Sequence, residues 1–548
     1  MTELTIYCER ITVNRTLKIA SLIYATSILL SRVIGLIRES VIGRTLGDQP
    51  EADVYWLAFV LPDFLNYLLA GGALSLVLIP LLQSAEQKGG KEAYWDCFWR
   101  IATPISLLVT MVTALLWYFT PELTPIVSPG FDVTQAELLN RLTRIILPAQ
   151  IFHVCGGLIS ATLQANDRHV APALAPLVYT GMIIVFGVVF GEKIGSEAFA
   201  WGVLAGSILG PFTCPLLAAW RGGVRLRPRL ELKHIEVRSY IWRALPVMLG
   251  FSIVVLDDML VKRGASQLAE GLVSQLHYAR TLMKVPMGVF GLAMGMATFP
   301  SISRHLAQGQ SKEAFGLLQN AASTLLILVG LSQAVLSIAS PEAVALIWGK
   351  ERLSLMAINH IGAYCAVLSL GLWAWSSQGL LARGFYAQGK TWLPTLLGSI
   401  LVLCFYPLYE FLSGASAINF ADWISQNIYE TGLGIGLALC SSLAISAYVC
   451  FLWLALCFSF GQSINEFYKF LWQLFKIELA VMVSIACTST VFSAGINSAS
   501  NYMELLVTAG LKSILSSVIF ILMCYVIKID EVKTLIDRIK YKLKPNAR

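Results

Sequence analysis

The chain has 548 residues, of which 56% are apolar and only 13% are charged, and its mean hydropathy is +0.69. Soluble domains carry about 25% charged residues, so this composition excludes a soluble globular protein and predicts an all-α polytopic membrane protein. The net charge of +7 follows from basic loops beside membrane segments and requires no nucleic acid as a partner.

Fourteen apolar runs are each long enough to cross a hydrocarbon core, which takes roughly 20 residues. The expected transmembrane helices cover 17–37, 54–83, 99–121, 138–164, 171–191, 198–219, 240–261, 272–301, 315–339, 355–382, 393–413, 432–459, 474–494 and 503–527. The second and eighth runs are long enough to be kinked or tilted. The first run lacks the features of a cleaved signal peptide and is expected to remain as a helix.

Lysine and arginine gather in two segments, with seven in 221–243 and seven in 528–548. If the N-terminus is cytoplasmic, both segments lie on the cytoplasmic side, as the positive-inside rule requires. We therefore expect both termini to be cytoplasmic in a bacterial inner membrane, which needs an even number of helices. We also expect the basic segments to contact anionic membrane lipids.

Two stretches that follow the fourth and tenth runs repeat one pattern. Each has an alanine, a basic residue and a proline at the same spacing, offset by 222 residues. The residues are Ala165, Arg168 and Pro172 in the first stretch, and Ala387, Lys390 and Pro394 in the second. Prolines in the second and eighth runs match at offsets of 224 and 220, which favours a duplication of six helices.

The duplication predicts fourteen helices arranged as two six-helix lobes in parallel repeat around a central cavity, with two further helices at the C-terminus. The expected segments are a cytoplasmic tail over 1–16, an N-lobe over 17–220, a basic linker over 221–239, a C-lobe over 240–459, helices 13 and 14 over 460–527 and a basic tail over 528–548. This architecture is typical of transporters in which one lobe rocks against the other.

Arg32 and Arg38 lie at the end of the first run. An arginine inside a bilayer costs between about 2.5 and 17 kcal/mol, so it faces a wet cavity or a partner. The two residues are separated by roughly 9 Å and about 120°, and form one patch only if the helix unwinds near Gly35. We expect Arg32 to bind an anion, because its guanidinium matches phosphate oxygens bidentately. Arg38 either does the same or pairs with Glu39 or Asp53.

The eighth run carries two more cations, Arg280 and Lys284, which are four residues apart and share a helix face. Pro286 and Gly288 could open the helix just beyond them. These cations belong to the counterpart of the second run, across the expected cavity. They are therefore candidates for binding the same anion.

Four stretches, 31–65, 71–82, 278–303 and 384–394, resemble the MviN/MurJ family of lipid II flippases within the multidrug/oligosaccharidyl-lipid/polysaccharide exporter superfamily. The resemblance implies a fourteen-helix inner-membrane protein that moves lipid II, an undecaprenyl-diphosphate-linked disaccharide-pentapeptide, from the cytoplasmic to the periplasmic leaflet by alternating access. Lipid II would then be the substrate. Peptidoglycan synthases stay open as further partners.

In this family, arginines that line the cavity meet the diphosphate, and acidic groups lie nearby. The resemblance carries this substrate-binding role onto Arg32 and Arg38 and places Glu39 and Asp53 as the acidic groups. Family members with a sodium site use polar groups in helices 7 and 11, but the eleventh run here has no Asn or Asp. We therefore expect no metal and no cofactor.

Two positions depart from the family pattern. Asn66 stands where some members have a cavity arginine, and the usual arginine of the eighth helix falls on Thr281, so that Arg280 comes one residue early. A shift of one residue turns a side chain by about 100°, so Arg280 can bind substrate only if the helix is locally rewound. The alternative is that Arg280 pairs with Asp257 or Asp258 one helix away.

Three other functions share some of these features or would need different ones. An exporter of another polyprenyl-linked oligosaccharide would share the fold and the cavity charge. A drug/cation antiporter would need acidic cavity residues in place of the arginines. An enzyme is not expected, because the adjacent Asp257 and Asp258 point about 100° apart on a helix and no phosphate-binding loop is present, so no catalytic residue is assigned.

Overall fold

The computed structural model describes residues 30–70, 73–221, 227–427, 432–492, 496, 501–529 and 531–532. All regular secondary structure in these residues is helical, and they contain no strand. Ten of the described helices are long and apolar enough to cross a membrane, or eleven if one bent pair counts as a single span. The prediction of an all-α polytopic membrane protein is confirmed, whereas the count of fourteen helices stays a prediction. The tail over 1–16 and most of the tail over 528–548 lie outside the described residues.

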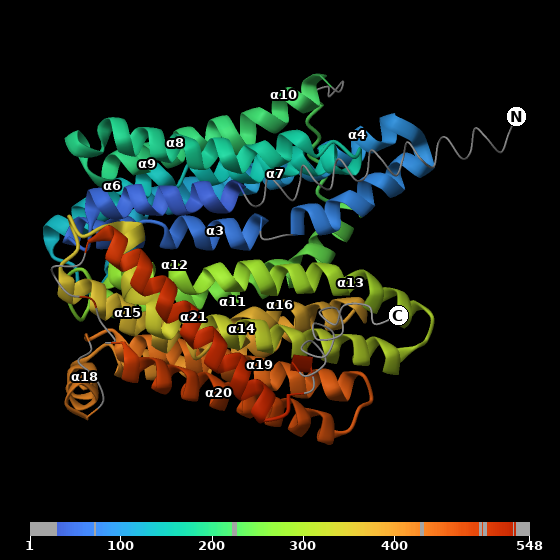
Figure 1. Ribbon diagram of the computed structural model, residues 1–548. Helices are drawn as coiled ribbons and strands as arrows, with labels where there is room; N and C mark the ends of the chain where they lie inside the picture. The colour runs from blue at the N-terminus through green and yellow to red at the C-terminus, as the bar shows by residue number, and fades with distance from the viewer. Residues whose placement is uncertain are drawn as a thin grey trace, which may run out of the picture. The chain divides into compact units, whose positions relative to one another are not determined.

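The chain divides into two compact units, 1–255 and 256–548. In the first unit, a helix over residues 30–46 precedes a series of shorter and longer helices (Figure 1). These are α2 (Pro50–Leu57), α3 (Val60–Ala70), α4 (Ala73–Tyr118), α5 (Thr120–Val127), α6 (Val133–Ile146), α7 (Ala149–Ala165), α8 (Val170–Ile194), α9 (Ser196–Ser207), the π-helix η1 (Ile208–Thr213) and α10 (Cys214–Arg221). Helix α11 (Ile235–Ser266) begins in the first unit and ends in the second.

The first helix is longer than the sequence predicts. Its apolar run stops near residue 37, but the helix continues to residue 46 and ends at Gly47, whose φ is +65°. The apolar run ends before Arg38, but the helix does not, and Arg38 and Glu39 bind each other inside it. The pairing lowers the cost of keeping both side chains in a buried segment.

The second run, expected over 54–83, is broken into α2, α3 and the start of α4. The break between α2 and α3 falls at residues 58 and 59, three or four residues before Pro62. Proline has no N–H to bond the carbonyl four residues earlier, so it favours an interruption at this point. Helix α4 is itself two helices joined at Gly89 and Gly90, and Gly90 has a φ of +68°. Of the two alternatives for the run over 54–83, kinked or tilted, the structure shows a break.

Apolar packing between α4 and α7 forms a core of the first unit, and Leu82, Phe98, Ile101 and Leu158 are buried there. Residues 227–236 lie against the polar edge of the same α4 helix. Arg229 pairs with Asp96 at 3.1 Å, and Arg100 pairs with Glu231 at 3.0 Å. The expected basic linker is therefore partly neutralised by α4.

The second unit is built around a long helix, α14 (Ser311–Trp348), which packs against α12, α13, α15, α16, α20 and α21. The other elements are α12 (Leu272–Pro286), the π-helix η2 (Met287–Gly291), α13 (Leu292–Ala307), α15 (Leu355–Ser369), α16 (Leu372–Ala387), α17 (Trp392–Phe411), α18 (Ala415–Asn427), α19 (Ile435–Ser459), α20 (Ile464–Val491) and α21 (Tyr502–Val526). Helix α20 packs against both α14 and α19, and Figure 1 shows these helices in the second unit.

The two units contain one local structure twice. The fourth run breaks between α6 and α7, and the tenth run breaks between α15 and α16, at an offset of 223 residues. At the ends of α7 and α16, Asp167 and Gly389 both adopt a positive φ, of +56° and +74°. The next residue donates its N–H five residues back in each case, from Arg168 to Leu163 at 2.8 Å and from Lys390 to Phe385 at 3.0 Å. These matched turns lie where the sequence pattern repeats.

Candidate functional site

The two arginines of the first helix are in different environments. The helix is continuous over residues 30–46, so it does not unwind near Gly35, and Arg32 and Arg38 lie on different faces. Arg32 is exposed and has no ion-pair partner among the described residues. Arg38 is half-buried, and its Nη2 donates to Glu39 Oε1 at 2.5 Å. Arg38 thus makes one of the pairs that the sequence suggested.

Arg38 also lies among polar groups from neighbouring helices. The hydroxyls of Tyr55 on α2 and Tyr179 on α8 are close enough to interact electrostatically with its guanidinium. Its Nε atom is buried and has no hydrogen-bond partner among the described residues. A guanidinium with an unused buried N–H keeps donor capacity for an oxygen of a ligand.

The remaining predicted residues of the first unit lie on α2 and α3. Asp53, on α2, is 1% exposed, and Glu39 is 4% exposed. Asn66, on α3, is half-buried. Asp63, one turn before Asn66, lies within electrostatic range of Tyr179, the same tyrosine that faces Arg38. Through Tyr179, the start of α3 and the first helix therefore border one polar region.

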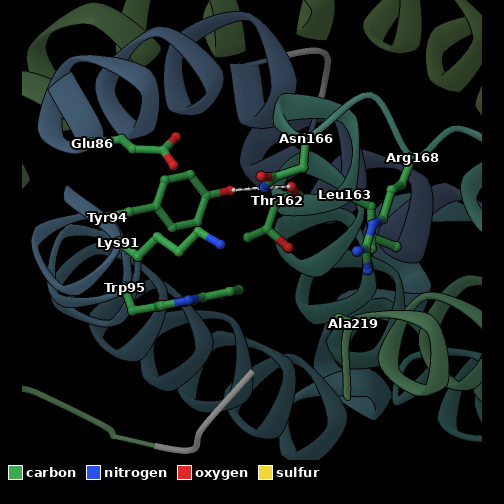
Figure 2. A pocket seen from close by; sticks show the side chains of 9 residues that line it. All are labelled: Glu86, Lys91, Tyr94, Trp95, Thr162, Leu163, Asn166, Arg168 and Ala219. Atoms are coloured by element: carbon green, nitrogen blue, oxygen red, sulfur yellow. Dashed lines mark hydrogen bonds between the residues drawn. The ribbon is translucent and has the colours of Figure 1, made fainter. Parts of the chain in front are cut away.

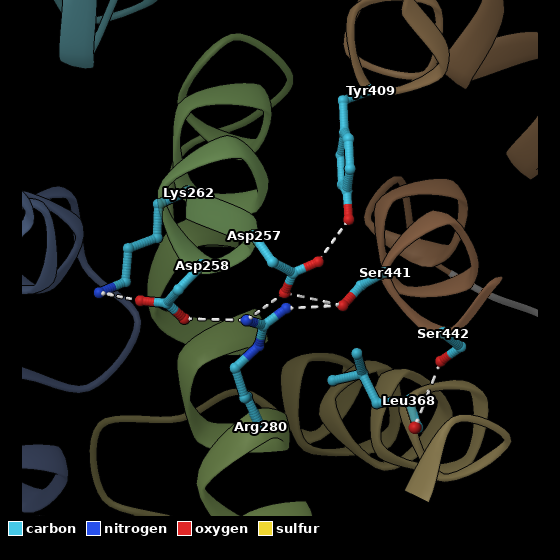
Figure 3. A network of polar contacts seen from close by, with 8 residues as sticks. All are labelled: Asp257, Asp258, Lys262, Arg280, Leu368, Tyr409, Ser441 and Ser442. Atoms are coloured by element: carbon cyan, nitrogen blue, oxygen red, sulfur yellow. Dashed lines mark hydrogen bonds and ion pairs between the residues drawn. The ribbon is translucent and has the colours of Figure 1, made fainter. Parts of the chain in front are cut away.

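In the second unit, Arg280 is the centre of a buried network (Figure 3). Its Nη1 lies 2.7 Å from Asp257 Oδ2 and 3.1 Å from Asp258 Oδ1, and its Nη2 donates to Ser441 Oγ at 2.9 Å. The Arg280 side chain is only 4% exposed. The helix around it, α12, is regular, so no local rewinding turns this arginine toward open space. The geometry matches the alternative in which Arg280 pairs with Asp257 or Asp258.

Each aspartate of this network has further partners. Tyr409 Oη donates to Asp257 Oδ1 at 2.5 Å, and Ser441 Oγ donates to Asp257 Oδ2 at 3.0 Å. Lys262 Nζ lies 2.9 Å from Asp258 Oδ2 on the same helix. The two adjacent aspartates diverge along α11, as expected, yet both reach the same guanidinium nitrogen. The network therefore joins α11, α12, α17 and α19.

Lys284 differs from Arg280 although it lies one turn further along α12. Lys284 is exposed, while Arg280 is buried. Both lie within electrostatic range of Asp258. After Pro286, α12 passes into the π-helix η2, so the helix is distorted where the sequence suggested that it could open.

Three members of the network escaped the sequence reasoning. Tyr409 and Ser441 are neutral residues in apolar runs and carry no signal of spacing or charge. Lys262 directly follows the expected seventh run, where a loop would begin, although its position four residues after Asp258 is a recognisable helix pair. A fourth residue, Arg383 on α16, was also missed, and its buried Nη1 has no hydrogen-bond partner among the described residues. The signal was its position directly after the tenth run, which ends at residue 382.

A small pocket of about 100 Å³ lies beside the end of α7 (Figure 2). Tyr94 Oη donates to the Thr162 carbonyl at 3.1 Å and accepts from Asn166 Nδ2 at 3.0 Å. Lys91 and Arg168 also line it and have no ion-pair partner among the described residues. The pocket could hold a small polar group, but it is too small for a lipid-linked disaccharide-pentapeptide.

Metal ligands do not cluster in the described part of the chain, where no group of three or more His, Cys, Asp or Glu side chains could hold an ion. The cysteines described there are free. The charged clusters above are thus built from protein groups that bind each other, or that can bind an anion.

Comparison with known proteins gives one consistent family. A family model described as lipid II flippase MurJ matches residues 42–509. The chain is 27% identical over 388 residues to the lipid II flippase MurJ of Burkholderia cenocepacia, which covers 68% of this chain and 74% of that protein. It is 26% identical over 416 residues to a probable lipid II flippase MurJ of Rhizobium meliloti, with coverages of 72% and 76%.

Solved structures show the same fold. A lipid II flippase MurJ in an inward closed conformation has a TM-score of 0.71 at 20% identity, covering 91% of this chain and 98% of that chain. An inward-facing multidrug resistance transporter of the MATE family has a TM-score of 0.59 at 14% identity, covering 78% and 94%. At these identities the likeness establishes the fold and says nothing about the substrate.

Proposed function

The chain belongs to the MurJ family of lipid II flippases, and from this premise we propose that it moves lipid II from the cytoplasmic to the periplasmic leaflet of a bacterial inner membrane. The observation that carries the proposal is the family match, which spans residues 42–509. The protein is a transporter and not an enzyme. Its relatives and structural neighbours are transporters too. Lipid II would supply the material for peptidoglycan synthesis.

The architecture follows from the same proposal. Fourteen helices would form an N-lobe over 17–220 and a C-lobe over 240–459, joined by the linker over 221–239, with helices 13 and 14 over 460–527. The matched turns after α7 and α16 and the matched breaks in the fourth and tenth runs support a parallel repeat. Both termini would be cytoplasmic, because the basic segments lie there under the positive-inside rule.

For the substrate, Arg32 is the strongest candidate. It lies in the first expected membrane helix, it is exposed, and it has no ion-pair partner among the described residues. A guanidinium in this setting suits the diphosphate of lipid II, whose oxygens it can bind bidentately. Arg38 would contribute its remaining donor capacity, while Glu39 and Asp53 would hold Arg38 and the surrounding helices in position.

The second unit would contribute differently. Arg280 is already bound by two carboxylates and a hydroxyl, so we assign it to holding α11, α12 and α19 together. Lys284, which is exposed on the same helix, is the better candidate for contact with the substrate. Asn66 would border the site from α3 as a neutral hydrogen-bonding group.

A rescue experiment tests the function. Cells depleted of their own lipid II flippase should regain growth and shape when this chain is expressed, and labelled lipid II should become accessible at the periplasmic face. Arg32→Ala serves as the loss-of-function control, with membrane levels measured in parallel. If the chain fails to rescue growth but restores a surface polymer in cells lacking its exporter, it transports another polyprenyl-linked oligosaccharide.

A further inference from the structure

A second set of polar contacts runs along α14, where this helix packs against α20 and α21. The contacts are Gln319 with Glu466 at 3.0 Å, Ser323 with Gln473 at 2.8 Å, Gln333 with Glu478 at 2.8 Å, and Glu342 with Lys512 at 2.6 Å. From Gln319 to Glu342 the helix rises roughly 34 Å, which is about the thickness of a hydrocarbon core. Polar side chains at such depth mark functional sites by default, because they are expensive to place there.

The charges of Glu342 and Lys512 neutralise each other. Both side chains are 1% exposed, and Lys512 Nζ lies 2.6 Å from Glu342 Oε1. A cation and an anion at this distance form a neutral pair, and replacing one alone would leave a buried charge. This contact therefore holds α14 and α21 together.

Glu478, on α20, lacks such compensation. Gln333 Nε2 donates to its Oε2, but Gln333 is a neutral amide. The other oxygen, Oε1, is buried and has no hydrogen-bond partner in the described part of the chain. Glu478 is thus a carboxyl group inside a membrane span that receives one hydrogen bond and no positive charge.

The charged groups on the surrounding helices are engaged elsewhere or lie near helix ends. On α20, Lys476 Nζ lies 5.8 Å from the centre of the Trp472 ring. On α21, Lys512 binds Glu342, which is nine residues, or about 14 Å, along α14 from Gln333. Apart from these residues and Glu478 itself, the charged side chains of the three helices lie in their first two turns. They are Lys312 and Glu313 on α14, Glu466 and Lys469 on α20, and Glu504 on α21. Helix α19, which also packs against α20, has no Asp, Glu, Lys, Arg or His.

A carboxylate in these surroundings is costly, and binding a proton removes its charge. We propose that Glu478 is a proton-binding site and that proton exchange there couples the transport cycle to the transmembrane proton gradient. The proton forms an O–H bond on Oε1, while Gln333 keeps its hydrogen bond to Oε2. Loss of the proton leaves a charge that favours separation of α20 from α14, so protonation biases a two-state packing.

The proposal rests on the proposed flippase function for its transport readout. Purified protein in liposomes would be supplied with fluorescent lipid II, with the membrane potential clamped by potassium and valinomycin. If one proton moves with each lipid, a gradient of one pH unit shifts the distribution of lipid II between leaflets by up to about tenfold. Glu478→Gln should reduce this shift to about onefold, because glutamine resembles the protonated acid and cannot exchange the proton.

Glu466→Gln is the matched control, since it makes the same change at the end of the same helix, where Glu466 pairs with Lys469. It should keep the shift of the wild type. Equal shifts in the wild type and Glu478→Gln would overturn the proposal, as would an equal loss in both variants. Membrane levels and thermal unfolding of each variant show whether it is folded.

An infrared measurement tests the site without transport. The difference spectrum between acidic and alkaline samples should contain a carboxylic acid carbonyl band in the wild type that is missing in Glu478→Gln. If this band is found but the wild type moves no lipid II, the proposed function fails and the proton site stands. If the spectra of the wild type and Glu478→Gln are the same, the proton site is refuted even when lipid II is transported.

Discussion

The buried network around Arg280 predicts a specific pattern of rescue. Arg280→Ala removes the partner of Asp257 and Asp258, but the two aspartates do not lose the same share of their positive counter-charge. Asp258 keeps Lys262 at 2.9 Å, whereas Asp257 keeps only the hydroxyls of Tyr409 and Ser441. The uncompensated charge therefore falls mainly on Asp257.

The magnitude follows from this difference. Removing one partner of a buried ion pair costs about 3 to 5 kcal/mol. Because Asp257 keeps two hydroxyl donors, we expect Arg280→Ala to lower the free energy of unfolding by about 3 kcal/mol, the lower end of this range. Adding Asp257→Asn should recover about 2 kcal/mol, because asparagine carries no charge, its Oδ1 can accept from Tyr409, and its Nδ2 can donate to the Ser441 hydroxyl. Asp258→Asn in the same background should recover little and should leave Lys262 without its carboxylate.

The assay is unfolding of the purified single and double variants in mixed micelles, followed by tryptophan fluorescence, with lipid II flipping measured on the same samples. Equal rescue by Asp257→Asn and Asp258→Asn would refute this account of the network. A fully stable Arg280→Ala would refute the buried pairing itself. The exchange Arg280→Thr with Thr281→Arg should not restore stability, because it moves the cation by about 100° away from Asp257.

Three further predictions concern the first unit and the topology. Arg32→Ala should abolish lipid II flipping while the protein keeps its normal level in the membrane. Arg32→Lys should keep only part of the activity, because an ammonium group lacks the bidentate fork. Full activity of Arg32→Ala in a complementation assay would contradict the assignment. In a background without native cysteines, a probe at Pro228 should be protected from an impermeant periplasmic reagent and a probe at Ser416 should react, and the reverse labelling would invert the topology. Gly156→Ala should destabilise the protein by about 1 to 3 kcal/mol, because a methyl group there would meet the carbonyl of Pro211, while Gly181→Ala, with no atom within 4 Å, serves as the control in thermal unfolding.

The fold class could be predicted from the sequence, because every segment in the hydrocarbon core of a membrane must satisfy its own backbone hydrogen bonds. Apolar runs of sufficient length must be helical to satisfy their backbone groups, and each of the fourteen expected runs contains helix in the described residues. The ends of helices were harder to predict, because they depend on local pairing. Arg38 and Glu39 bind each other, and the helix continues eight residues beyond Arg38.

The site was only partly accessible for a related reason. Charged residues in apolar runs are conspicuous, so Arg280, Asp257 and Asp258 could be named and their pairing foreseen as one alternative. Tyr409 and Ser441 could not, because a hydroxyl in an apolar helix is ordinary until the packing of distant helices places it beside a carboxylate. Glu478 had a visible signal, since it is a lone carboxyl in the thirteenth run, but its partner Gln333 lies 145 residues away.

The hydrogen-bonding capacity of each arginine decides which one can hold a diphosphate. A guanidinium has five N–H groups, and Arg280 directs Nη1 to two carboxylates and Nη2 to Ser441. A phosphate would have to displace these buried contacts and leave Asp257 without a counter-charge, which costs as much as deleting the arginine. Arg32 has no such contacts to give up among the described residues, so its full fork can meet the ligand. The net free energy that a cation adds to binding is its gain from the ligand minus the contacts that it gives up in the protein. The affinity for the diphosphate should therefore depend on Arg32 far more than on Arg280.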